Sequence, residues 1–266
     1  MSETRVNIER RGHVALVTLA RPDKRNAMDS AMFQALDDAA RTVAADAELR
    51  AVVLAGEGKS FCAGLDLMSF ASGAAEMRKL LDRPEGEEAN LAQRVAWAWR
   101  RCPVPVIAAL HGEVFGGGLQ VALGADIRIA RPDARLAVME VRWGLIPDMA
   151  GSQTLRNLVR RDVALELAWT GRIVAGEEAA ALGLVTRLAD EPLAAALDLA
   201  ETIAGQSPDA VQGVKRLFNE AWACSAAEAL RLEEQLQISI IGRPNQMEAV
   251  RAGMAGETPR FGPART

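Results

Sequence analysis

The chain has 266 residues and a net charge of −4 at pH 7, with 50% hydrophobic and 25% charged residues, as expected for a globular protein. It contains no Tyr, two His and three Cys without CxxC or HExxH spacing, which argues against a metal site and against a disulfide framework. No apolar run could span a membrane, the first residues lack the apolar core of a signal peptide, and no basic cluster favours nucleic-acid binding. We therefore expect a cytoplasmic protein without a metal, a nucleic-acid partner or a membrane partner.

Strands and helices are predicted to alternate through the first part of the chain. Apolar runs at 14–19, 51–55 and 103–110 predict buried strands, the last of them buried on both faces. Asp29 or Ser30 is expected to cap a helix after the first strand. The apolar face of that helix comprises Met32, Phe33, Leu36, Ala40 and Val43.

The alternation continues through residue 138. Residues 68–90 are polar and charged, so we expect a mobile excursion there, followed by a helix at 91–101. Three glycines at 116–118 open another helix, and residues 126–130 and 136–138 predict short strands. Such alternation predicts an α/β protein with a parallel sheet and helical crossovers.

Helices dominate the last third of the chain. A single strand is expected among them, at 184–188. The helices are predicted at 152–160, 162–169, 192–204, 208–222, 225–241 and 245–253.

Two glycine-containing loops are candidates for ligand binding. Residues 56–60, GEGKS, resemble the end of a phosphate-binding loop, but Val53 stands where that motif needs its first glycine, so no nucleotide site is expected. The glycines at 116–118 lie at a strand-to-helix junction, where first-turn N–H groups point at a ligand. The same glycines also fit a tight packing junction between helix and strand.

The segment 61–67, FCAGLDL, follows a buried strand and is a second candidate for backbone amides that face a ligand. An ordinary turn with Asp66 as a helix cap would have the same composition. We interpret Cys62 as a small core residue rather than a nucleophile, because no His stands nearby in the sequence to activate it.

Glu140 and Asp148 form a pair of carboxylates separated by an apolar segment that contains WGLIP. A carboxylate beside apolar surface has a raised pKa and can act as a base near neutral pH. Two surface acids, with Asp148 as a turn residue after Pro147, are the alternative.

Taken in order, these segments resemble the crotonase superfamily, the enoyl-CoA hydratase/isomerase family. The resemblance implies a core spiral of β-β-α units at 1–195, a helical trimerisation region at 196–266, and acyl-CoA thioester substrates. CoA is part of the substrate, so no separate cofactor is expected. The matching segments are RPDKRNAMD, FCAGLDL, PVPVIAALHGEVFGGGLQVALGADIRIA, LAVMEVRWGLIPDMAGSQTL, WTGRIVAGEEAAALGLV and SPDAVQGVK, which together span nearly the whole chain.

The resemblance also implies roles for individual residues. The amides of Ala63 and Gly117 would form an oxyanion hole that stabilises the charge developing on the thioester oxygen. Arg260 and Phe261 lie in a tail that could reach the CoA of a neighbouring subunit. Substrate contacts are implied for Lys24, Arg25, Ala27, Gly64, Leu65, Asp66, Leu67 and Gln120.

The expected reaction depends on three side chains. Glu140 matches one of the two glutamates of the hydratases, and the other position is Gln120, whose amide could hold the acyl chain or a water but cannot exchange a proton. Asp148 stands where delta-3,5-delta-2,4-dienoyl-CoA isomerases carry an acidic partner. The resemblance therefore implies a double-bond shift through an enolate, with Glu140 and Asp148 moving the proton. The alternatives are an enoyl-CoA hydratase with Glu140 as acid and base, and a non-catalytic acyl-CoA binder.

A homo-trimer or a dimer of trimers is implied by the same resemblance. Residues 225–241 carry Ala229, Leu232, Leu236 and Ile240 at helical spacing, which fits either a subunit contact or the core of the chain itself.

Overall fold

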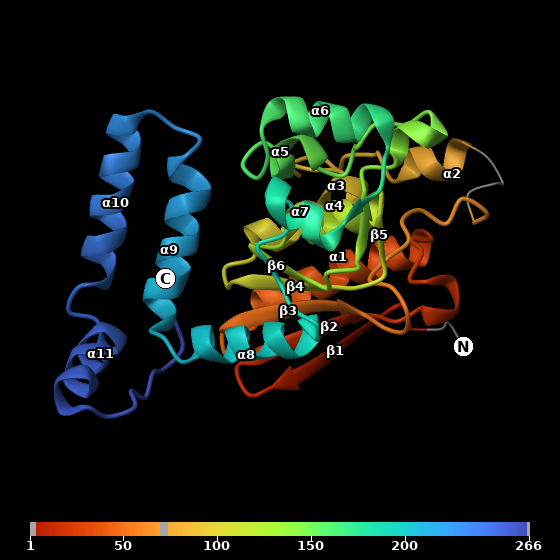
Figure 1. Cartoon of the computed structure of the whole chain (residues 1–266). Coiled ribbons are helices and arrows are strands. Elements are labelled where there is room, and N and C mark those ends of the chain that lie inside the picture. The colour runs from red at the N-terminus through yellow and green to blue at the C-terminus, as the bar shows by residue number, and fades with distance from the viewer. Residues whose placement is uncertain (1–3, 70–73, 265–266) are drawn as a thin grey trace.

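A six-stranded sheet forms the centre of the protein in this computed structural model, which describes residues 4–69 and 74–264 (Figure 1). Its strand order is β1-β2-β3-β4-β6-β9, and a second sheet has three strands in the order β5-β7-β8. β1 is antiparallel to β2, and the other neighbours in the larger sheet are parallel, as the alternation of strands and helices predicts. The strands are β1 (Val6–Arg11), β2 (Val14–Leu19), β3 (Ala51–Gly56), β4 (Val106–Leu110), β5 (Glu113–Phe115), β6 (Ile127–Ala130), β7 (Arg135–Ala137), β8 (Val174–Ala175) and β9 (Arg187–Leu188).

Helices connect these strands and complete the chain. Those before residue 205 are η1 (Pro22–Lys24), α1 (Ser30–Ala45), α2 (Ala74–Lys79), α3 (Leu91–Arg101), α4 (Gly117–Gly124), η2 (Glu140–Trp143), α5 (Gly151–Leu155), α6 (Arg161–Thr170), α7 (Gly176–Leu182) and α8 (Pro192–Ala204). The last three are α9 (Pro208–Ala221), α10 (Ala226–Ile240) and α11 (Pro244–Ala255).

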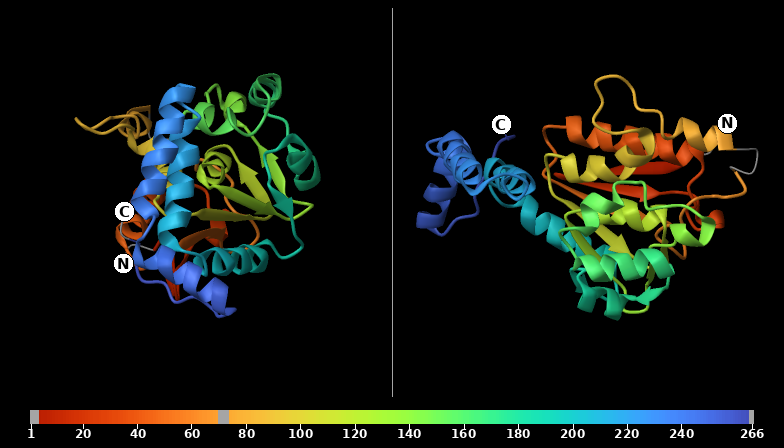
Figure 2. Two further views of the ribbon diagram at one scale, coloured as in Figure 1. Left: turned by 90° about the vertical axis from the view of Figure 1, so that its left-hand side faces the viewer. Right: turned by 90° about the horizontal axis from the view of Figure 1, so that it is seen from above.

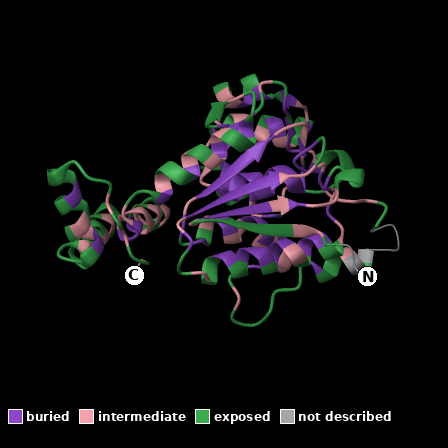
Figure 3. Ribbon diagram, turned by 90° about the horizontal axis from the view of Figure 1, so that it is seen from below, coloured by how far each residue is buried: buried purple, intermediate pink, exposed green. Residues whose placement is uncertain are grey.

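Both faces of the larger sheet are buried, which explains the continuous apolar runs of its strands (Figure 3). Along β2, Val17 and Leu19 face the main core beneath α1, α3 and α4, while Val14 and Leu16 face a smaller core. That smaller core is closed by α8, which packs on the sheet through a row of alanines. The exception is the edge strand β1, whose residues are mostly exposed.

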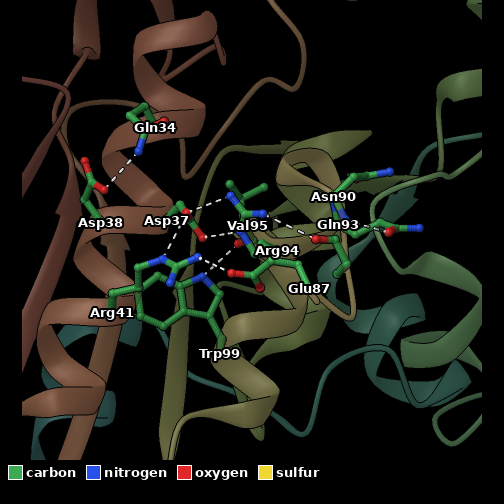
Figure 4. Close-up of polar contacts among 11 residues, drawn as sticks. Gln34, Asp37, Asp38, Arg41, Glu87, Asn90, Gln93, Arg94, Val95 and Trp99 are labelled. Atoms are coloured by element: carbon green, nitrogen blue, oxygen red, sulfur yellow. Dashed lines mark hydrogen bonds and ion pairs between the residues drawn. The ribbon is translucent and has the colours of Figure 1, made fainter. Parts of the chain in front are cut away.

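A buried carboxylate joins α1 to α3 (Figure 4). Asp37 is only 3% exposed and receives both Nε and Nη2 of Arg94 at 3.0 Å. Arg41, one turn further along α1, adds a third contact to the same carboxylate at 3.2 Å. Bidentate pairing of this kind compensates the desolvation of a buried charge, and it connects α1 to α3.

The helices α9 to α11 project from the rest of the molecule (Figure 2). The expected boundary between residues 195 and 196 falls inside α8, whose packing on the sheet places it with the core, so the projecting part begins after Ala204. Lys215 of α9 connects the two parts. Its Nζ, on a side chain only 7% exposed, donates to the carbonyls of Trp99 and Val104 at 3.1 and 2.9 Å and to Asp126 at 2.7 Å.

The projecting helices carry two kinds of apolar side chain. The stripe predicted within 225–241 (Ala229, Leu232, Leu236 and Ile240) is half-buried on α10, which packs against α9. Other large apolar side chains on these helices are exposed to solvent. They are Val214, Phe218, Trp222, Leu230, Ile238, Met247, Val250 and Met254.

Most predicted elements before residue 150 are confirmed, and the differences have local causes. β1 was not predicted, because its sequence VNIERR has no apolar run and owes its strand form to pairing with β2. Within 68–90 the structure places α2, while residues 70–73 lie outside the described residues. α7 was also missed, and the helix expected at 152–160 ends early, at Leu155. Across the described ranges, no helix is long and apolar enough to cross a membrane.

Candidate active site

A mostly apolar cavity of about 200 Å³, here called the central cavity, opens where the chain after β3, the start of α4 and the η2 segment meet. Among its described lining residues, Glu140 and Asp148 are the ones that ionise. A larger cavity of about 370 Å³, between α9, α10 and the end of α3, shares no residue with it. The apolar lining of the central cavity includes Met28, Phe33, Leu67, Leu80, Ala92 and Trp143.

The geometry of the glycines at the start of α4 is compatible with both of the roles that the sequence left open. A Cβ on Gly118 would lie 2.6 Å from the carbonyl oxygen and the Cβ of Cys62, so this glycine permits close packing of helix and loop. Gly116 has a φ of +49° and turns the chain from β5 into the helix. Gly117 is the first residue of α4 and lines the central cavity, where its N–H is free of helical hydrogen bonds.

The structure corrects the predicted role of Ala63. Its N–H donates to the carbonyl of Arg25 at 2.9 Å and is therefore unavailable to a ligand. The next residue, Gly64, has a φ of +92°, a left-handed conformation that glycine adopts readily, and Leu65 follows it. Within the described ranges, no hydrogen bond occupies the N–H groups of Leu65 and Gly117.

These two N–H groups belong to adjoining segments. A Cβ built on Gly64 would lie 3.8 Å from the backbone nitrogen of Gly117 and 2.8 Å from the carbonyl oxygen of Phe115. Both Leu65 and Gly117 line the central cavity. The arrangement can offer two backbone donors to one oxygen atom of a ligand.

Glu140 begins η2 and is 8% exposed. Its Oε1 accepts a hydrogen bond from Nε2 of Gln120 at 2.5 Å, whereas its Oε2 is buried without a hydrogen-bond partner among the described residues. Burial raises the pKa of Glu140, and the negative charge of Asp148 raises it further. A buried carboxylate with one unpaired oxygen is poised to exchange a proton with a ligand.

Asp148 lies at the open side of the same cavity. More than a third of its surface is exposed, yet partial burial among the surrounding chain raises its pKa as well. The two carboxylates that the sequence paired therefore share one cavity, one of them deep and the other at the rim. Trp143 and Leu145, from the segment between them, line the wall that joins them.

Gln120, for which a contact with the acyl chain or a water is predicted, lies behind the cavity rather than in its lining. The residue is 2% exposed. Its Oε1 accepts from the backbone N–H groups of Met149 and Gly151, at 2.9 and 3.1 Å, and its Nε2 donates to Glu140. The side-chain amide of Gln120 thus connects Glu140 to the backbone of residues 149–151.

Of the remaining predicted contact residues, some line the cavity and others do not. Gly64, Leu65 and Leu67 line it. Lys24, Arg25, Ala27 and Asp66 do not; Lys24 is exposed at the end of η1, and Arg25 forms an ion pair with Glu113 at 2.9 Å.

Arg21, which no sequence pattern marks as a site residue, contacts both Ala27 and Asp66. Its Nη1 donates to the carbonyl of Ala27 at 2.9 Å and to the Asp66 carboxylate at 2.8 Å. In the C-terminal tail, Phe261 accepts a hydrogen bond from Arg50 at 2.7 Å, and Arg260 donates its N–H to Glu248.

Cys62 is a core residue, as predicted. Its thiol donates to the carbonyl of Asn26 at 3.0 Å, and burial raises the pKa of this thiol to about 12, far from a reactive thiolate. His111 is held by a contact of its Nε2 with the carbonyl of Gly58. In the part of the chain that the structure describes, no three His, Cys, Asp or Glu side chains are grouped to bind a metal.

Known proteins are similar to this chain in sequence and in fold. The sequence model of the enoyl-CoA hydratase/isomerase family matches residues 9–258. The human mitochondrial Delta(3,5)-Delta(2,4)-dienoyl-CoA isomerase is 35% identical over 258 residues, covering 90% of this chain and 76% of the human protein. A probable enoyl-CoA hydratase of Rhizobium meliloti is also 35% identical, covering 98% of this chain and 99% of that protein.

Solved structures show the same fold. The crystal structure of an enoyl-CoA hydratase from Bacillus anthracis superposes with a TM-score of 0.89 at 28% identity, covering 97% of this chain and 98% of that one. An enoyl-CoA hydratase from Mycobacterium tuberculosis gives a TM-score of 0.86 at 32% identity, covering 98% and 99%. With its α/β crotonase fold and C-terminal helices, the chain belongs to the enoyl-CoA hydratase/isomerase family and is a crotonase-family enzyme acting on acyl-CoA.

Proposed function

We propose that this enzyme shifts double bonds in the manner of a delta-3,5-delta-2,4-dienoyl-CoA isomerase. The observation that carries the proposal is the meeting of two carboxylates with raised pKa and two unpaired backbone N–H groups at one apolar cavity. An isomerase needs these parts and no others from its chain, because the reaction moves one proton and the electrons stay within the substrate.

In the proposed mechanism, the thioester carbonyl oxygen first accepts hydrogen bonds from the N–H groups of Leu65 and Gly117. One carboxylate removes a proton from the carbon chain, and the electron pair of the broken C–H bond spreads into an extended enolate. A new C–H bond then forms at another carbon with a proton from the second carboxyl group, so the double bonds move and nothing is oxidised or reduced. Loss of one such N–H donor typically costs about 3–4 kcal/mol of barrier.

Glu140 and Asp148 are the proposed pair for the two proton transfers. A raised pKa brings a carboxylate closer to the working pH and makes it a better base, and both residues have this property. Gln120 carries no exchangeable acidic proton, so it cannot supply the second acid that hydration by two glutamates requires.

An enoyl-CoA hydratase with Glu140 as its acid and base is the second candidate. It is favoured by the identity to the Rhizobium meliloti protein, which equals the identity to the human isomerase. The two functions separate on substrate: hydration consumes the chromophore of crotonyl-CoA, whereas isomerisation of a 3,5-dienoyl-CoA creates a conjugated 2,4-diene.

The test compares wild-type enzyme, Glu140→Gln and Asp148→Asn on both substrates, with Asp162→Asn as an exposed control on α6. Isomerisation by the wild type, a fall of about 10²- to 10⁴-fold in either site variant and wild-type rates in the control are expected. Full isomerisation by both site variants would refute the pair. Turnover of crotonyl-CoA alone would establish the hydratase. Binding of acyl-CoA without turnover of either substrate would establish a non-catalytic binder.

We propose further that the protein is a homo-trimer or a dimer of trimers, built through α9 to α11. The exposed apolar side chains on these helices, including the edge-to-face pair of Phe218 and Trp222, support this proposal, because surface of that kind is normally covered. Light scattering coupled to gel filtration tests it. A monomer mass across the working concentration range would contradict it.

A further inference from the structure

The contacts of Gln120 carry an inference that rests on the proposed function. We infer that Gln120 is a positioning residue, which ties Glu140 to the backbone beside Asp148 and leaves Oε2 of Glu140 as the oxygen that carries the proton. The residue lies behind the central cavity, so it acts through its neighbours rather than on the substrate.

The orientation of the Gln120 amide is determined by its surroundings. Two backbone N–H groups, from Met149 and Gly151, point at one of its terminal atoms at 2.9 and 3.1 Å. Only the carbonyl oxygen can accept them, and two donors use both of its lone pairs. The NH₂ group must therefore face the other way, toward Glu140.

This orientation determines how Glu140 can hold a proton. The NH₂ group donates to Oε1 at 2.5 Å, and a neutral carboxyl group receives such a bond best on its carbonyl-type oxygen. The hydroxyl form is then Oε2, which has no other hydrogen-bond partner among the described residues. The donated bond also favours the ionised form of Glu140, and thereby limits the increase in its pKa that burial causes.

The same amide connects the two carboxylates. Met149 directly follows Asp148, and both backbone N–H groups bound by Gln120 lie within three residues of it. A Cβ on Gly151 would lie 2.7 Å from Oε1 of Gln120, so this turn packs tightly on the glutamine. Any shift of Gln120 would move Glu140 and the turn after Asp148 relative to each other.

The test uses Gln120→Glu and Gln120→Met, with Gln153→Glu as the matched control. Glutamate at 120 still accepts both backbone N–H groups but replaces the donor by an oxygen, so it isolates the contact with Glu140. Methionine removes both kinds of contact, and Gln153 is an exposed residue of α5, outside the cavity. Each protein is assayed for kcat and KM from about pH 5 to about pH 9, and the Glu140 carboxyl is titrated by infrared difference against Glu140→Gln.

In Gln120→Glu, two carboxyl oxygens would share a proton, so the acid limb of kcat/KM should move to higher pH by about one unit or more. We expect kcat at pH 7 to fall at least about tenfold in both variants, while KM changes less than about threefold because Gln120 lies outside the cavity lining. The control should match the wild type. Wild-type kcat and an unmoved acid limb in both variants would overturn the inference.

The infrared titration separates this inference from the proposed function. If the wild type fails to isomerise a dienoyl-CoA, the proposed function falls. The titration of Glu140 still reports on Gln120 in that case, and an identical curve in Gln120→Glu and wild type would refute the positioning role.

Discussion

The two sides of the central cavity are built in different ways. On one side the groups that we propose to act are the backbone N–H groups of Leu65 and Gly117, held by packing so close that a Cβ on Gly118 would lie 2.6 Å from Cys62. On the other side they are carboxylates, and the segment between them exposes 58% of Trp143 and 73% of Ile146. The rigid side is suited to stabilising charge on an oxygen, which occupies one place in every acyl-CoA. The side that carries the carboxylates consists of side chains. It is suited to the features that differ between substrates, which are the position of the proton and the shape of the acyl chain.

The largest effect is expected from Gly118→Ala, which tests the rigidity of the backbone side. The added methyl group must displace the chain at Cys62, so we expect a loss of about 2–3 kcal/mol of unfolding free energy and a marked fall in kcat/KM. Gly253→Ala on α11 is the control, because no atom lies within 4 Å of its Cβ position and alanine favours a helix by up to about 1 kcal/mol. Urea denaturation measures both, and equal stability of the two variants would mean that the backbone side is adaptable.

A smaller effect is expected from Glu140→Gln, which removes a charge from the carboxylate side of the central cavity. The folded protein binds the proton of Glu140 more tightly than the unfolded chain does, because the pKa rises from its ordinary value of 4.5 on folding. Stability therefore falls as pH rises through the interval between the unfolded and folded pKa values. Glu140→Gln should be more stable than the wild type at pH 8, and this advantage should disappear below about pH 4. A wild type that is the more stable protein at pH 8 would show that the carboxylate is paired better than the structure indicates.

The smallest effect is expected from Trp143→Ala, which tests the side of the cavity that carries the carboxylates. Trp143 lines the cavity, so its loss should raise KM for long acyl chains about three- to tenfold while kcat changes little. Trp169→Ala is the matched control, since Trp169 is 70% exposed and lies outside the lining. Equal KM values in the two variants would exclude Trp143 from chain recognition.

Elements that bury an apolar run could be predicted from sequence, and elements that depend on distant partners could not. The strand at 51–55 and the helix at 91–101 appear where expected, because their own residues fill the core. β1 exposes most of its side chains and is a strand only through its six paired positions with β2. The short β8 likewise depends on β7, a partner about forty residues away in the chain.

The site divides along a similar line. Glu140 and Asp148 could be paired from sequence because carboxylates beside an apolar segment are visible as residue types. The direction of a backbone N–H is not visible in that way: the N–H of Ala63 bonds to the carbonyl of Arg25, whereas no hydrogen bond within the described ranges occupies that of Leu65. The role of Gln120 depends on N–H groups about thirty positions further along the chain, which no local pattern encodes.

Lys215 has a mechanical consequence for the whole molecule. The ammonium group of Lys215 donates to two carbonyls and a carboxylate of the core. These contacts oppose a rotation of α9 relative to the core about the link that follows α8. If subunits meet through α9 to α11, the angle between these helices and the core is therefore the same in each subunit. The distance between the cavities of two subunits would then depend on contacts within each chain as well as on the subunit contact. Neutralising this one amine would remove three contacts that hold α9 on the core.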